Sequence, residues 1–186
     1  MVRTNATRLE GWAFLIAFIA CVPLANWMVA NVGTTCVPDG PCIVPIGFGL
    51  TAPSGVLLVG VALVLRDLVQ RRLGFRVALL AIGAGSILSA LVAPPSLVFA
   101  SAVAFLVSET VDLAIFTPLQ KRGLVKAAAL SSLVGLVVDS CVFLYLAFGS
   151  LMFVEGQILA KAMMVILALP FVAWLRRREN VVAAMT

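Results

Sequence analysis

The sequence contains no histidine and few charged residues. Its 186 residues include 13 lysines and arginines and 8 aspartates and glutamates, so that 11% are charged while 63% are hydrophobic. A soluble domain has about a quarter of its residues charged and fewer than about half apolar. A soluble fold of this length could not bury so much apolar surface, so we predict an integral membrane protein. The lack of histidine also excludes histidine-ligated metals, histidine general bases and histidine proton relays.

Sequence signatures of several other protein classes are also missing. There is no Gly-x-x-x-x-Gly-Lys loop for nucleotide phosphates, no cysteine spacing typical of zinc sites, and no basic stripe with interleaved aromatic residues for nucleic acid. Asp112 and Asp139 lack the flanking glycines of intramembrane aspartic dyads. We therefore predict no enzymatic activity, no cofactor or metal, and no nucleic-acid partner. The expected partners are membrane lipid and a small-molecule substrate.

Six apolar segments are each long enough to cross a bilayer, which takes about 20 residues. They are predicted as helices over residues 11–32, 53–72, 75–92, 96–119, 126–148 and 154–175. The first segment is too long for the core of a signal peptide and is predicted to be retained. The predicted fold class is therefore an all-α membrane protein, a bundle of six transmembrane helices. Residues 1–178 form its single domain and residues 179–186 a short cytoplasmic tail.

Lysine and arginine residues gather near alternate ends of these segments. They are Arg3 and Arg8, then Arg66, Arg71, Arg72 and Arg76, then Lys121, Arg122 and Lys126, and finally Arg176, Arg177 and Arg178. The other connections, over residues 33–52, 94–96 and 148–153, contain none, and Lys161 is the one basic residue placed elsewhere. Because basic connections stay in the cytoplasm, both ends of the chain are predicted to be cytoplasmic.

The connection over residues 33–52 is rich in proline and glycine and yet apolar. It is predicted to be either a lid or re-entrant hairpin over the helices, or an ordinary external loop packed on the helix ends. Cys36 and Cys42 flank a Pro-Asp-Gly-Pro turn within it, and a disulfide between them is one option in an oxidising compartment. Cys21 and Cys141 lie in apolar segments and are expected to pack as small hydrophobes.

Polar residues inside the apolar segments carry the functional prediction. Each charged side chain costs at least about 2.5–3.5 kcal/mol at the bilayer centre, so such groups face a wet cavity or one another. The candidate binding residues are Asn26, Arg66, Asp67, Gln70, Ser101, Phe105, Glu109, Asp112, Asp139, Phe143 and Lys161. Positions 105, 109 and 112 share one face of a helix. We predict a polar pocket from which a small polar molecule is carried across the membrane.

Structural interpretations of the same residues remain open at this point. Asp139 and Lys161 could form an interhelical pair that only holds the bundle together. Arg66 and Asp67 could form an interfacial ion pair in which the arginine extends to the lipid headgroups. Small residues in the segment 75–92 predict a close helix-packing seam, and a homodimer through this seam is one option.

Several runs of residues carry a resemblance to a known family. They are RDLVQRRLG at 66–74, ASAVAFLVSETVD at 100–112, the set Ser131, Gly135, Asp139, Phe143, Ala147 and Phe148, and Lys161 followed by Pro170. These runs resemble the queuosine precursor transporter family, also called the vitamin uptake transporter family. The resemblance implies a multi-pass protein of the bacterial cytoplasmic membrane. It implies import of 7-deazaguanines, such as 7-cyano-7-deazaguanine, for queuosine in tRNA.

The resemblance also implies that Asn26, Asp67, Ser101, Glu109, Asp112, Asp139 and Lys161 serve the substrate site. A carboxylate can accept hydrogen bonds from the adjacent N–H donors of a guanine-like base, a role expected for Glu109 or Asp112. The base carbonyl needs a donor, which Lys161 or Asn26 would supply. The two phenylalanines among the candidates would stack on the rings.

The energy source of transport has more than one interpretation. Asp112 and Asp139 are the candidates for carrying a coupling proton, because a carboxyl group inside the membrane can bind a proton and release it again. Facilitated diffusion followed by trapping in the cell is the alternative. A different class of function is a membrane-embedded binding subunit for a vitamin-like molecule that requires an energy-coupling partner.

Overall fold

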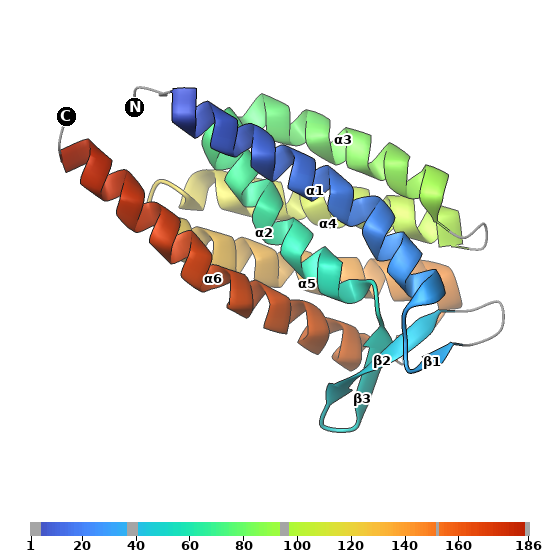
Figure 1. Cartoon of the computed structure of the whole chain (residues 1–186). Coiled ribbons are helices and arrows are strands. Elements are labelled where there is room, and N and C mark those ends of the chain that lie inside the picture. Colours follow the sequence, from blue (N-terminus) through green and yellow to red (C-terminus); the bar gives the residue numbers. More distant parts are fainter. Residues whose placement is uncertain (1–4, 37–40, 94–96, 152, 185–186) are drawn as a thin grey trace.

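The computed structural model describes residues 5–36, 41–93, 97–151 and 153–184. Within these ranges the chain forms six helices and one small antiparallel sheet (Figure 1). The helices are α1 (Asn5–Asn31), α2 (Val56–Leu73), α3 (Phe75–Val92), α4 (Val98–Leu119), α5 (Leu124–Phe148) and α6 (Val154–Ala184). The predicted helical bundle is confirmed, whereas the sheet was not predicted. Arg3 and the turns at 38–40 and 94–96 lie outside the described residues.

Five of the described helices, all except α2, are long and apolar enough to cross a membrane. The exception has 18 residues, four of which are charged: Arg66, Asp67, Arg71 and Arg72. α2 contacts each of the other five helices, and Arg66 and Asp67 are completely buried. The charges of α2 are therefore shielded from lipid by neighbouring helices. A sixth crossing by α2 remains our interpretation of this central position.

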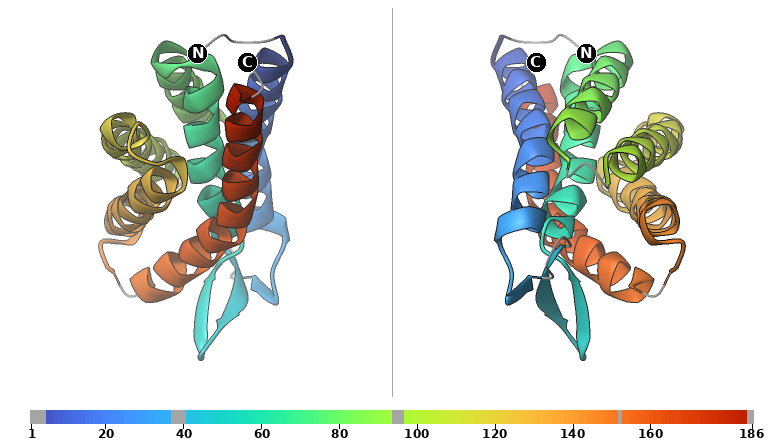
Figure 2. Two further views of the ribbon diagram at one scale, coloured as in Figure 1. Left: turned by 90° about the vertical axis from the view of Figure 1, so that its left-hand side faces the viewer. Right: turned by 90° about the vertical axis from the view of Figure 1, so that its right-hand side faces the viewer.

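The first turn of α1 and the last turn of α6 lie at the same end of the bundle (Figures 1 and 2). Ion pairs join the elements there: Arg72 contacts Glu10 at 3.2 Å and also Glu179, and Arg178 contacts Glu10 at 2.9 Å. Arg71 contacts Glu179 at 2.7 Å. At this basic end of the bundle Glu10 of α1 thus joins arginines of α2 and α6, and Glu179 of α6 joins two arginines of α2.

Two helix boundaries extend beyond the apolar segments. α1 begins at Asn5 rather than at residue 11, and α6 continues to Ala184 rather than ending at residue 175. Residues 179–184 of the predicted tail are therefore helical. Hydropathy marks the part of a helix that can lie in lipid, but backbone hydrogen bonds can continue the same helix into water.

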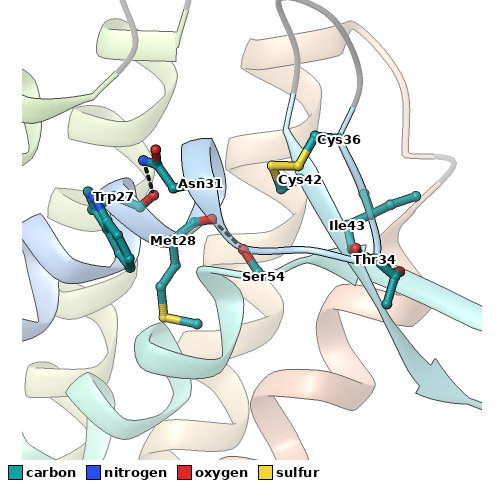
Figure 3. The surroundings of a disulfide bond; sticks show 8 residues. All are labelled: Trp27, Met28, Asn31, Thr34, Cys36, Cys42, Ile43 and Ser54. Atoms are coloured by element: carbon teal, nitrogen blue, oxygen red, sulfur yellow. Dashed lines mark hydrogen bonds between the residues drawn. A yellow bond between two sulfur atoms is a disulfide. The ribbon is translucent and has the colours of Figure 1, made fainter.

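The sheet lies at the opposite end of the bundle (Figure 1). It consists of β1 (Thr35–Cys36), β2 (Cys42–Gly47) and β3 (Leu50–Pro53), in the order β1-β2-β3. A disulfide joins Cys36 to Cys42, and the Ser54 hydroxyl donates to the Met28 carbonyl of α1 at 2.7 Å (Figure 3). The strands β2 and β3 contact α6, and β2 also contacts α1. The described part of this connection is therefore a small sheet that contacts α1 and α6.

The small residues of α3 form a packing seam, as predicted. Ala81, Gly85 and Ser89 follow one another at intervals of four residues and are all buried. A Cβ atom on Gly85 would lie 2.8 Å from the Phe105 ring of α4, so only glycine allows this approach. Within the chain α3 contacts both α4 and α1, and the Gly85 position faces side chains of both helices.

Candidate functional site

A cavity lies among the helices in the half of the bundle nearer the sheet. Its wall is formed by the first turns of α2, α4 and α6 and the last turns of α5, together with α1 and one residue of α3. Its volume open to a water-sized sphere is about 100 Å³. A single water needs only about 10–15 Å³ on this measure, so the cavity has room for several waters or a small guest.

Six of the predicted site residues line this cavity. They are Asn26, Ser101, Phe105, Asp139, Phe143 and Lys161. Most of the remaining wall is apolar, with alanine and valine side chains from α1 and α2. An apolar wall with a few polar groups is typical of small-molecule binding sites.

Aromatic rings on α4 and α5 form part of the wall and are supported from behind. Phe105 packs against Phe18 of α1, with ring centroids 5.9 Å apart. Phe143 packs edge-on against Phe148 at 6.2 Å, and both of these rings also line the cavity. Rings held in this way offer fixed surfaces for a planar guest.

Lys161 is the centre of the polar network at the cavity. Its ammonium donates to Asp139 Oδ2 at 2.6 Å, to Ser140 Oγ at 2.8 Å and to Gln157 Oε1 at 2.9 Å. An ammonium has three N–H groups, and all three are taken by these partners. The Ser108 hydroxyl of α4 donates to the other oxygen of Asp139 at 3.3 Å. The interhelical pair considered from the sequence is therefore present, and it lies on the cavity wall.

The other five predicted residues form a second polar network that does not line the cavity. Its centre is Arg66, which contacts Asp67 at 2.9 Å, Glu109 at 3.1 Å and Asp112 at 2.6 Å. All four side chains are at most 2% exposed. The interpretation in which Arg66 extends to the headgroups is wrong, because three carboxylates from α2 and α4 hold its guanidinium inside the bundle.

Hydroxyl and amide groups complete this second network. The Ser131 hydroxyl of α5 donates to Asp67 Oδ2 at 3.1 Å. Gln70 accepts from Arg66 at 3.4 Å and donates to the Thr117 hydroxyl at 2.9 Å. The two networks meet on α4, where the consecutive residues Ser108 and Glu109 join different networks. The residues predicted to form one site thus form two adjacent polar networks, of which only the Lys161 network lines the cavity.

Gln157 is a cavity residue that was absent from the predicted set. It is completely buried, lines the cavity and contacts Lys161. The signal was present in the sequence, because Gln157 lies four residues before Lys161 and therefore on the same helical face. A polar amide beside an intramembrane lysine in an apolar helix was reason enough to include it.

The sheet also contributes to the cavity wall. Pro41, which directly precedes β2, and Pro53 of β3 both line it, as does Gly55 next to α2. A Cβ atom on Gly55 would lie 2.4 Å from the Ala25 carbonyl of α1. The hairpin therefore borders the cavity at the end opposite the basic end of the bundle.

Residues 88–175 match the model of a family described as putative vitamin uptake transporter. The family resemblance predicted from the sequence motifs is confirmed over this segment, which contains α4, α5 and most of α6. No curated protein and no solved structure matches the chain. The match and the apolar helices support a multi-pass membrane transporter.

Proposed function

We propose that this chain, whose residues 88–175 match the putative vitamin uptake transporter family, imports a 7-deazaguanine across the bacterial cytoplasmic membrane for queuosine synthesis. The observation that carries the proposal is the cavity, which combines aromatic walls with the Asp139–Lys161 pair. A pair that served only to hold the bundle together would gain nothing from lying at a cavity. Intramembrane polar contacts average only about 0.6 kcal/mol, which is little compared with the insertion cost of two charges.

The chemistry of the cavity suits a guanine-like base. Such a base has flat rings, which Phe105 and Phe143 would contact, and adjacent N–H donors, which a carboxylate accepts. Asp139 is the carboxylate that lines the cavity, whereas Glu109 and Asp112 contact Arg66. We therefore propose that Asp139, in place of Glu109 or Asp112, accepts the hydrogen bonds from the N–H groups of the base.

The Arg66 network supports a role in proton coupling. One guanidinium faces three carboxyl groups, so full ionisation would leave two excess negative charges inside the bundle. Each unpaired buried ion costs several kcal/mol, and protonation removes that cost. Asp139, in contrast, has an ammonium of its own at 2.6 Å. Of the two candidates for carrying a coupling proton, we therefore favour Asp112.

Uptake by the purified chain in liposomes tests the proposed function. We expect the chain alone to take up radiolabelled 7-cyano-7-deazaguanine, and expression to restore queuosine in tRNA of a bacterium that cannot make the precursor. Binding of the ligand without uptake would favour the alternative, a binding subunit that needs an energy-coupling partner. No binding at all would reject the deazaguanine assignment.

An imposed pH gradient tests the coupling. If Asp112 carries the proton, a gradient directed inward should drive accumulation by the wild type, and Asp112→Asn should only equilibrate the substrate. Asp139→Asn should lose uptake both with and without the gradient, because Asp139 is proposed to contact the substrate. Wild-type uptake that is indifferent to the gradient would mean facilitated diffusion.

A further inference from the structure

The amide nitrogen of Gln157 has no hydrogen-bond partner among the described residues, although the side chain is completely buried. Buried N–H groups in folded proteins are almost always paired, and an exception calls for an explanation. Because Gln157 lines the cavity, a bound guest is a partner that the protein itself does not supply.

The orientation of this amide is fixed by its neighbour. The Lys161 ammonium can only donate, so the atom of Gln157 at 2.9 Å from it must be the carbonyl oxygen. Asp139 and Ser140 hold the ammonium in turn, at 2.6 and 2.8 Å. The nitrogen of Gln157 is thereby left as the free donor of this side chain.

Lys161 and Asn26, the two donors predicted for a substrate carbonyl, already have partners within the protein. All three N–H groups of Lys161 have acceptors within the protein. The Asn26 amide nitrogen donates one of its two N–H groups to the Val22 carbonyl of its own helix at 3.0 Å, and the side chain is only partly buried, unlike that of Gln157. The donor expected for a substrate carbonyl, Lys161 or Asn26, is thus better provided by Gln157.

We propose that Gln157 and Asp139 together bind the lactam edge of the substrate, which is the adjacent N–H and C=O of a planar heterocycle. Asp139 accepts from the ring N–H, and the Gln157 amide donates to the ring carbonyl. Lys161 lies between these two residues and positions both without touching the substrate. This inference rests on the proposed function, and it adds which groups of the substrate class are recognised.

Two ligands and one substitution test the proposal by calorimetry on the purified chain. The ligands are 7-deazaguanine, which has the lactam edge, and 2-amino-7-deazapurine, which lacks the ring oxygen and the adjacent N–H. We expect the wild type to prefer 7-deazaguanine by at least about tenfold, because a buried donor left unpaired weakens binding by such a factor. In Gln157→Met, which keeps the length of the side chain, the preference should fall by at least about threefold. The preference that remains reports the ring N–H that Asp139 accepts.

Two further variants complete the test. Gln120→Leu removes an amide that bonds only to the Thr117 carbonyl and lies outside the cavity, so the preference should be unchanged. If Gln157→Met does not fold, Gln157→Glu at pH 8 replaces it, because glutamate keeps an oxygen for Lys161 and loses the N–H.

The possible results separate the inference from the proposed function. Equal wild-type affinity for the two ligands, or an undiminished preference in the Gln157 variants, would overturn the inference alone. A wild type that binds neither ligand would overturn the proposed function and the inference together.

Discussion

The two buried cations of this protein have different surroundings. Lys161 has one carboxylate, Asp139, and its remaining N–H groups are bound by neutral oxygens. Arg66 has three carboxylates, from Asp67, Glu109 and Asp112. A one-to-one pair has no net charge, whereas a fully ionised one-to-three cluster would carry two excess negative charges, each of which is costly inside the bundle. This difference is the reason for our proposal that the substrate binds beside Asp139 and that Asp112 carries the coupling proton.

Replacing one member of the Lys161–Asp139 pair should lower the stability of the protein more than replacing both members. Lys161→Met leaves the Asp139 carboxylate buried without its cation, which should lower the free energy of unfolding by about 3–5 kcal/mol. The double variant Lys161→Met, Asp139→Asn should recover most of the thermal stability but no deazaguanine binding. Thermal shift and calorimetry on the same samples check both parts. The exposed Lys126→Met serves as the control, and stability that is equal in all variants would contradict the role of the pair.

Phe105 and Glu109 lie one turn apart on α4 but have different expected effects. Phe105 lines the cavity, so Phe105→Leu should weaken ligand binding by about 1–3 kcal/mol through loss of stacking. Glu109→Gln should leave the affinity within about threefold and instead alter the response of uptake to a pH gradient. Binding isotherms and gradient-driven uptake separate the two. A larger loss of affinity in the Glu109 variant would place that carboxylate at the substrate.

At the scale of elements, glycine residues determine how closely the helices approach. Gly60 of α2 lies against α6, where an added Cβ atom would be 2.6 Å from the Lys161 carbonyl and 2.9 Å from the Met164 Cβ. The contact between α2 and α6 therefore also sets the position of Lys161. Gly83 of α3 provides a contrast, because an added Cβ atom there would meet nothing within 4 Å.

We expect Gly60→Ala to destabilise the bundle and Gly83→Ala to leave it intact. The added methyl group at Gly60 pushes against a backbone carbonyl, and such overpacking costs about 1–3 kcal/mol. Because α6 must shift, ligand binding should weaken as well. At Gly83 the same change adds helix propensity without a clash. Melting temperatures and ligand affinities of the two variants check this, and equal effects would argue against close contact between α2 and α6.

At the scale of the whole molecule, the charges and the sheet mark opposite ends. The arginine–glutamate contacts gather where α1 begins and α6 ends, and the sheet projects at the other end (Figure 1). Together with the excess of basic residues in the connections, this arrangement predicts that the first end is cytoplasmic and that the cavity lies nearer the outer surface.

Cysteine labelling in intact cells tests this orientation. Phe48 at the tip of the hairpin is 96% exposed, and Lys121 lies exposed in the turn between α4 and α5. In a chain carrying Cys21→Ala and Cys141→Ala, Phe48→Cys should react with a membrane-impermeant maleimide. Lys121→Cys should react only after the membrane is opened. The reverse pattern would invert the proposed orientation.

The sequence alone determined the membrane class, the helical bundle and the small-residue seam of α3. Each of these depends on composition or on short-range spacing along one helix. It also identified the polar residues of both networks, because a charge in an apolar segment is visible without any structure. The family resemblance had the same basis, since the motif residues could be read directly from the chain.

Only the tertiary structure decided how those residues are divided. Phe105 and Glu109 share a helical face, yet the first lines the cavity beside Phe18 of α1 and the second contacts Arg66 of α2. The free amide of Gln157 and the hairpin that borders the cavity also depend on packing between segments distant in sequence. Hydropathy gives the depth of a residue in the membrane, but only the contacts of its helix decide which neighbour it meets.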